Sequence, residues 1–533
     1  MAGLTLCPCV AIAQAGPPPS SLMQNPQQGA TPRPLPTPAA PAAPIQQAPV
    51  RLAPAPPITS IDRAPEMPVL PHGSVLYGPP ARQTEGLWKA VPGGLPTPTD
   101  DPMKIDAATD PILRLAREET PQPPFRAAIE AAVRHNPALD ESIAQRDEAE
   151  AVRNEARARE YPVADLAVTG YHTLSRTFSN DPGNVLERSR PRGRTDATLR
   201  VQQAVIDFGA IGQRIAAGND RLTAATAGIE DASAQIALRA IAAWYNVFGY
   251  RAMVRLGEAF AESQRDLHER IETRVAQGMA APGDIAQVDS YIAASDAQLA
   301  DFRRSLANAE AQYVGIVGVP APVNLGRAPA PDLRGIAPAG LNKDVAGLPL
   351  VRQAKGSADA AGRDAAALKA DAHPQLTAGV DAGRYGVLEN TSDYDIRANL
   401  TLSMRIGGGA KQRIDQALAR ADGADARYRR TVTEAQRDAT IAWSDLAALN
   451  DAKHAIEANY MASRRSRDVL VERFRVSRGT LFDVLSAQSN YFGVAARYIQ
   501  TVTELDTSRY VLLARTGHLL AVLAIDPSTL DAR

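Results

Sequence analysis

The sequence feature that most constrains the fold of this 533-residue chain is an internal repeat. Residue types recur at an offset of 212 early in the chain and at an offset of 199 later. The matching pairs are Pro137 with Pro349, Pro162 with Pro374, Arg274 with Arg473, Asp284 with Asp483, and Gly318 with Gly517. Two halves with such spacing are expected to share one supersecondary pattern, and the change of offset is expected to fall in a polar loop.

Each half reads as helix, strand, loop, strand, very long helix and helix. We place the first repeat at residues 125–320, with strands at about 163–178 and 195–208. The second repeat covers residues 345–525, with strands at about 375–387 and 394–406. In these strands apolar side chains alternate with polar ones, which is typical of a strand between unlike environments.

The polar faces of these strands carry the arginines Arg200, Arg397 and Arg405. The alternative to a barrel is a soluble sandwich with its apolar face packed inward, but four strands isolated among helices are too few to build one. A charged side chain also fits a wet lumen better than a dry core. We therefore predict a contribution to a transmembrane β-barrel, with these three arginines facing its lumen.

Two stretches of the chain, Gly209–Arg274 and Lys411–Arg473, contain no proline and are dominated by small residues. Each would span on the order of 90 Å as one helix, at about 1.5 Å per residue. The segments Ile285–Ile316 and Val484–Leu513 are expected to return antiparallel after short turns. The fold class that follows is mainly α, with two long helical hairpins and two strand pairs per chain.

The first residues read as an export signal. The apolar run Leu4–Ala13 leads into an Ala-Gln-Ala sequence, so residues 1–15 are predicted to be a signal peptide. Cys7 and Cys9 are the two cysteines of the chain, and cleavage after Ala15 would remove both, together with any thiol chemistry. No Lys or Arg precedes the apolar run, so the true start of the leader stays open.

A proline-rich stretch follows. Of the 41 prolines, 27 lie between Gly16 and Pro124. Proline lacks a backbone N–H and opposes both helices and sheet ladders, so residues 16–120 are predicted to be a disordered arm. It serves either as a flexible spacer or as an arm that contacts cell-wall material or a partner.

Composition and motifs argue against catalysis. A formal net charge of -1 with both signs interleaved gives no reason to expect nucleic acid as a partner. The seven histidines are scattered singly, and Gly407–Lys411 lacks the spacer of a phosphate loop. No nucleophile elbow or pair of carboxylates in a loop stands out. We expect no enzyme activity, no cofactor and no metal site.

Three motifs give the chain a family resemblance over about residues 125–525. They are the strand end Val205–Gly209, the turn Arg274–Gly278 that leads to Asp284, and the run Arg475–Gln488. Together with the duplication and the fixed spacing, they make the chain resemble the TolC-like outer membrane factor family.

The resemblance implies a homotrimer in which each protomer gives four strands to one shared twelve-stranded barrel. The helices would form an α-barrel that is a long periplasmic tunnel. Four strands cannot close a lipid-spanning barrel alone, since bacterial examples start at about eight strands. The partners implied are outer membrane lipid, a periplasmic adaptor (membrane fusion) protein and an inner-membrane pump. The location implied is the cell outer membrane, with a long periplasmic portion.

The resemblance also assigns candidate sites to the hairpin turns. Acidic residues just past the second turn line the narrow periplasmic entrance in the family, which makes Asp483 the pore-aperture candidate, although an N-capping role fits it equally well. Asp284 is expected to be a cap alone. Ser486 stands where the family often has a second acid, so the constriction should be less negative. The candidates for contact with the adaptor at the hairpin tips are Arg274, Gly278, Asp284, Arg475, Ser477, Arg478 and Gly479.

The function predicted from these features is a passive duct for small-molecule efflux or type I protein secretion, and residues 491–520 lean toward the secretion branch. The alternative is a periplasmic coiled-coil adaptor or scaffold without a pore, which should carry one hairpin and flanking β domains. A secreted hydrolase is the third hypothesis. The transported substrate and the resting state of the tunnel stay open.

Overall fold

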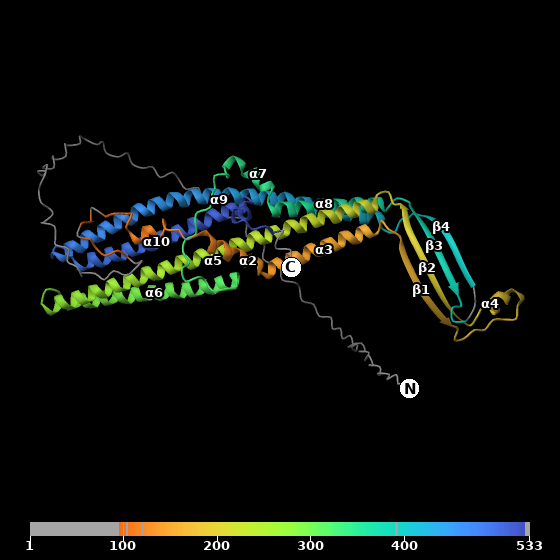
Figure 1. The fold of residues 1–533 in the computed structure, drawn as a ribbon, viewed down its shortest axis with the longest axis horizontal. Helices are drawn as coiled ribbons and strands as arrows, with labels where there is room; N and C mark the ends of the chain where they lie inside the picture. Colours follow the sequence, from red (N-terminus) through yellow and green to blue (C-terminus); the bar gives the residue numbers. More distant parts are fainter. Residues whose placement is uncertain (1–94, 100, 103–104, 120, 390–392, 528–533) are drawn as a thin grey trace, which may run out of the picture. The chain divides into compact units, whose positions relative to one another are not determined.

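The computed structural model describes residues 95–99, 101–102, 105–119, 121–389 and 393–527 (Figure 1). They all belong to one compact unit, Tyr77–Arg533. The predicted signal peptide and most of the predicted arm lie outside the described residues.

The elements, in chain order, are α1 (Pro111–Arg114), α2 (Gln122–Arg134), α3 (Pro137–Ala158), β1 (Val163–His172), the short turn η2 (Pro182–Asn184), α4 (Val185–Ser189), β2 (Gly193–Ile206), α5 (Ala210–Ala276), α6 (Pro282–Val317), the short turn η3 (Pro338–Gly340), α7 (Leu341–Ala346), α8 (Pro349–Ala370), β3 (Gln375–Tyr385), β4 (Asp393–Ser403), α9 (Ala410–Arg475), α10 (Leu481–Arg515) and α11 (Leu519–Leu523).

Two long antiparallel hairpins, α5 with α6 and α9 with α10, run side by side (Figure 1). Helix α5 has 67 residues and α9 has 66, so each extends about 100 Å. Both begin after a glycine in the left-handed region, Gly209 with φ 86° and Gly409 with φ 75°. These equivalent glycines turn the chain from strand into helix, and the proline-free sequence beyond them lets each helix continue to its turn.

The four strands form one antiparallel sheet in the order β1-β2-β3-β4, so β2 of the first repeat pairs with β3 of the second. Strand β1 ends at His172 and β4 at Ser403, short of the predicted ends at about 178 and 406. The ladder between β1 and β2 closes where Thr173 N donates to Arg192 O at 2.6 Å. Alternation of side chains continues past both points, but backbone pairing does not.

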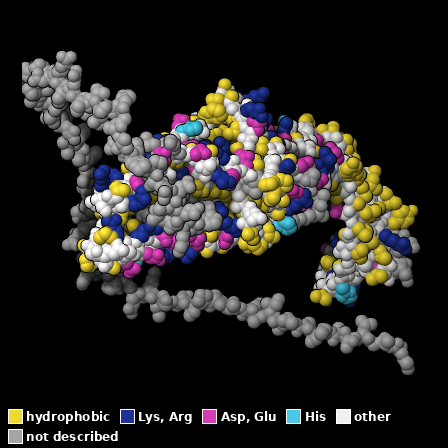
Figure 2. Space-filling view, turned by 60° about the vertical axis from the view of Figure 1, so that its left-hand side comes forward, with side chains coloured by type: hydrophobic (Ala, Val, Ile, Leu, Met, Phe, Trp, Pro, Cys, Tyr) yellow, Lys and Arg dark blue, Asp and Glu magenta, His cyan; other side chains and the backbone are white. Residues whose placement is uncertain are grey.

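One face of the sheet is apolar and exposed. Leu166, Ile396 and Leu400 lie on this face and are 74%, 66% and 67% exposed. Hydrophobic side chains gather over the sheet in the space-filling view (Figure 2). A soluble sandwich would bury this face, and no described segment covers it.

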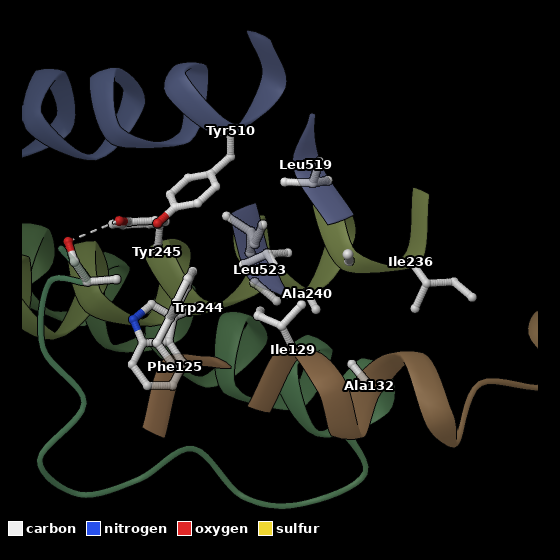
Figure 3. Packing of buried hydrophobic residues seen from close by; sticks show 14 of the residues in the cluster. Phe125, Ile129, Ala132, Ile236, Ala240, Trp244, Tyr245, Tyr510, Leu519 and Leu523 are labelled. Atoms are coloured by element: carbon white, nitrogen blue, oxygen red, sulfur yellow. Dashed lines mark hydrogen bonds between the residues drawn. The ribbon is translucent and has the colours of Figure 1, made fainter. Parts of the chain in front are cut away.

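The main core lies where the two repeats meet beside α2 and α11 (Figure 3). Phe125 of α2 stacks edge-on against Trp244 of α5 at 5.3 Å between ring centroids, and Tyr510 of α10 closes the cluster at 5.6 Å. Trp244 donates its ring N–H to Gly326 O at 2.9 Å, which fixes the loop between the repeats. Aromatic packing of this kind joins the two halves into one body.

The end of the predicted disordered arm packs against the helices. Ile112 and Leu113 of α1 are fully buried, and Asp110 caps this helix. The Asp110 carboxylate also accepts a hydrogen bond from the Tyr460 hydroxyl and forms an ion pair with Arg464 at 2.5 Å. The prediction of disorder up to residue 120 is therefore wrong for these residues. Their two large apolar side chains and the Asp-Pro helix start outweigh the local proline content.

Among the described helices, none has an apolar stretch of the length and hydrophobicity needed to cross a membrane. In the same part of the chain, no group of His, Cys, Asp and Glu is arranged to hold a metal ion.

Candidate functional site: the two hairpin turns and the polar sheet face

The structure places the predicted tip residues in two turns and in the helix ends beside them, at the same end of the hairpins (Figure 1). The first turn joins α5 to α6 over residues 277–281, and the second joins α9 to α10 over residues 476–480. Each position of the second turn is 199 residues after its counterpart in the first, as the repeat requires.

Both turns close in the same way. Met279 N donates to Arg274 O at 2.8 Å in the first turn, and Arg478 N donates to Arg473 O at 2.8 Å in the second. The residue before each donor is left-handed, with φ 72° at Gly278 and φ 57° at Ser477. This pattern satisfies the last carbonyls of the incoming helix, and glycine suits it better than serine.

The start of α10 is capped from both sides. Thr480 Oγ accepts a hydrogen bond from Asp483 N at 3.2 Å, and Asp483 Oδ2 accepts one from Thr480 N at 3.2 Å. Hydrogen bonding with the side chain and then the backbone of Thr480 holds the pKa of Asp483 below its ordinary value. Asp483 is therefore ionised at neutral pH, and its half-exposed carboxylate is both a cap and a charge available to the solvent.

The start of α6 has only half of this arrangement. Asp284 Oδ2 accepts a hydrogen bond from Ala281 N at 3.1 Å, in the same geometry as Asp483. The return bond is missing because the side chain of Ala281 has no acceptor atom. Pro282 at the first helical position instead contributes a backbone angle that suits a helix start.

Arg274 connects the two turns. Its guanidinium lies 4.7 Å from the centre of the Phe474 ring, and its Nη1 donates to Phe474 O at 3.4 Å. A longer contact, 3.5 Å, reaches Ser477 Oγ. The first hairpin thus holds the last turn of α9 through one side chain, a contact that the sequence spacing did not indicate.

The remaining tip candidates differ in exposure. Arg475 pairs with Glu472 of its own helix at 2.6 Å, whereas Arg478 is exposed. Gly479 packs closely on the end of α9, and a Cβ there would lie 3.2 Å from Phe474 N. This glycine therefore has a packing role in the turn.

Three large apolar side chains at the turns were not among the predicted residues. Met279, Val476 and Phe482 are 59%, 51% and 58% exposed. Met279 and Val476 lie between the end of one helix and the start of the next, and Phe482 lies in the first turn of α10. Their signal in the sequence is an apolar residue at or beside a predicted turn. Together they give the tip surface an apolar character beside its arginines.

The polar face of the sheet carries paired charges. Arg200 Nε lies 2.7 Å from Asp381 Oδ1, and Asn399 donates to the other oxygen of Asp381 at 2.7 Å. Arg397 pairs with Asp395 of its own strand. Arg405 lies beyond the end of β4 in an exposed segment, outside the strand that the prediction gave it.

Both repeats match the sequence profile of a known protein family. The profile of the family described as outer membrane efflux protein matches residues 128–319 and 345–518. The chain belongs to that family. As an outer membrane efflux protein it lies in the cell outer membrane with a long periplasmic helical portion, and its family is one of channels, not of enzymes.

Solved structures share its fold. VceC from Vibrio cholerae is 18% identical, with a TM-score of 0.67 over 74% of this chain and 96% of VceC. A membrane protein from Pseudomonas aeruginosa is 19% identical, with a TM-score of 0.66 over 74% of this chain and 93% of its own. The outer-membrane channel OprN is 17% identical, with a TM-score of 0.66 over 83% of this chain and 99% of OprN. No curated protein gives a significant match to the sequence.

The family resemblance and the fold class, a mainly helical chain with duplicated halves and four strands, are thus confirmed.

Proposed function

We propose that this outer membrane efflux protein is one subunit of a homotrimeric duct that exports small molecules or proteins. The observation that carries the proposal is the four-stranded sheet with one exposed apolar face, one face of paired charges and two open edges. Lipid suits the first face and water the second, and three copies supply enough strands to close a barrel. The family favours this function over a periplasmic adaptor without a pore.

The hairpin turns are the proposed contact with a periplasmic adaptor, through which an inner-membrane pump would deliver substrate. Exposed Met279, Val476 and Phe482, together with Arg478, support this because interfaces combine apolar anchors with arginine. Asp483 is the proposed aperture residue. Its ionised carboxylate would give three negative charges at the entrance of a trimer.

The oligomeric mass of the full chain, extracted from outer membranes in mild detergent, tests the proposal. Native mass spectrometry or light scattering should give three chains per particle. A protein that leaves the cell with the soluble periplasm, or that is monomeric in detergent and in lipid nanodiscs, would refute it.

A further inference from the structure

The two edges of the sheet lack a partner strand within the chain. Strand β1 pairs with β2 alone and β4 with β3 alone among the described strands. Unpaired backbone groups are costly in lipid, so each edge needs another strand. Since the four strands alternate in direction, β4 of one copy and β1 of the next can pair antiparallel and continue the sheet.

We infer that β4 pairs with β1 of a second copy in one defined, staggered register, in which Leu400 lies opposite Leu166 of that copy. This inference rests on the proposed trimer and adds the geometry of its contact. Within one chain, the residues Asp165, Arg200, Asp381 and Arg397 lie opposite one another in a row across the sheet. In the alternative, which we call the level register, this row continues without a shift and Arg397 lies opposite Asp165 of the next copy.

Strand lengths favour the staggered register. Strand β1 has 10 residues and β4 has 11. Pairing Leu166 with Leu400 aligns residues 163–172 with 403–394, so all 10 residues of β1 have a partner. The level register aligns only 163–169 with 399–393, and a stagger of four in the opposite direction aligns only 163–165 with 395–393. A shift by one residue is excluded because it would turn the apolar face of one strand to the polar side.

Barrel geometry limits the size of the stagger. Strands in closed barrels tilt by about 35–45°, so a row of opposite residues climbs along the strands as it passes around the barrel. Over four strands spaced about 4.8 Å apart the climb is about 13–19 Å, or roughly four to six residues at about 3.3 Å each. The proposed register is displaced by four residues from the level one, which is within this range. A displacement of two would pair 163–171 with 401–393 and is below the range. A displacement of six would pair 165–172 with 403–396 and leave two residues of β1 without a partner.

The chemistry of the opposing faces agrees with this register. On the apolar face it sets Leu166 opposite Leu400, Ala164 opposite Leu402 and Val168 opposite Ala398. Compared with the level register, the staggered register lacks one exposed ion pair, between Asp165 and Arg397 of neighbouring copies. Such a pair contributes little, whereas three more residues with backbone partners matter greatly in lipid. The row of charges therefore climbs the lumen as a spiral and does not close into a ring.

Disulfide crosslinking of the full chain tests the register. In a chain with Cys7→Ser and Cys9→Ser, the pair Leu166→Cys with Leu400→Cys reports the staggered register, and Leu166→Cys with Ile396→Cys reports the level one. Within one chain the two edges are about 14 Å apart, too far for a disulfide, whose Cα atoms lie within about 7 Å, so any bond joins two copies. After mild oxidation in membranes, the first pair should give covalent dimers and trimers in several-fold higher yield than the second.

The outcomes are distinct. Preferential crosslinking of the Leu166 and Ile396 pair would overturn the register but keep the trimer. No crosslinking of either pair in a protein that is trimeric by mass would overturn the proposed register, and a monomer would overturn the proposed function as well. A second set, Ala164→Cys with Leu402→Cys against Ala164→Cys with Ala398→Cys, reports the same two registers with smaller changes at one edge. Agreement between the sets is required.

Discussion

The two hairpin turns have the same backbone and different chemistry. Both close with the same hydrogen bond to an arginine carbonyl, both contain a left-handed residue, and both are followed by an aspartate at the third helical position. The first turn uses Gly278, Ala281 and Pro282 at positions where the second has Ser477, Thr480 and Leu481. The hairpin therefore requires this backbone conformation, whereas the side chains at the turn can differ.

The difference indicates a division of roles. The first turn is formed by residues that suit its backbone and need no side-chain capping bond beyond that of Asp284. The second turn accepts a strained serine and compensates with the two-way cap between Thr480 and Asp483. Because strain that is held by local bonds is common at working sites, the second turn is the better candidate for the aperture.

The largest expected effect comes from the left-handed positions. Gly278→Ala should destabilise the first turn by about 1–2 kcal/mol, because an L-residue is penalised in this conformation. No atom lies within 4 Å of the added Cβ, so the cost is that of the backbone alone. Ser477→Ala is the matched control and should change the second turn by less than about 0.5 kcal/mol, since a side chain is already present. Hydrogen exchange of the turn amides measures both, and equal effects would contradict the comparison.

Loss of the two-way cap should have the next largest effect. Thr480→Ala should weaken the start of α10 by about 1 kcal/mol because Asp483 N loses its acceptor. The converse change, Ala281→Thr, should protect the first turn of α6, where the side-chain acceptor is missing and Asp284 N donates to Ala281 O at 3.0 Å. Exchange rates of the amides at Asp483 and Asp284 report the two changes. If Ala281→Thr gave no protection, the difference between the caps would not be the source of the difference between the turns.

Removal of the bridge between the turns should cost less. Arg274→Ala removes the contact with the Phe474 ring, which is worth about 0.5–1 kcal/mol at an exposed site. The effect should appear as faster exchange in the last turn of α9, although the substitution is on α5. Thr273→Ala, at an exposed neighbour on α5 whose hydroxyl donates to Glu269 O of its own helix, serves as the control. Faster exchange confined to α5 would show that the bridge does not couple the hairpins.

The smallest expected effect is a pH dependence of the second turn. The folded pKa of Asp483 lies below its ordinary value of 3.8, so the carboxylate stabilises the turn above that pH. This contribution should be lost as the pH falls through the lowered folded pKa. Asp483→Asn keeps an acceptor for Thr480 N and should remove the pH dependence. Carboxyl titration followed by NMR on the hairpin region checks this, and an unchanged dependence in the variant would assign it to another group.

The overall fold could be predicted because its signals repeat. The duplication, the alternating strands and the long stretches without proline each determine an element whatever its neighbours do. The strand ends could not be predicted, since the alternation of side chains runs past His172 and Ser403 while the ladder stops there. The packing of α1 was missed because proline density outweighed the two buried residues Ile112 and Leu113 in the sequence.

The tip was predictable only in part. Turn positions and the cap at Asp483 follow from local sequence, because both depend on residues within one turn of each other. The contact of Arg274 with Phe474 depends on how the two hairpins lie against each other, and no spacing along the chain encodes that. The exposure of Met279, Val476 and Phe482 likewise depends on which surfaces the neighbouring helices leave open.

The most direct test of the central claim, a trimeric duct with its aperture at the second turn, is single-channel conductance in a planar bilayer. Wild-type protein is compared with Asp483→Asn and with the equivalent first-turn variant, Asp284→Asn. The duct should conduct and favour cations, Asp483→Asn should reduce this selectivity, and Asp284→Asn should leave it unchanged. Absence of conductance from a folded trimer, or equal effects of the two variants, would contradict the claim.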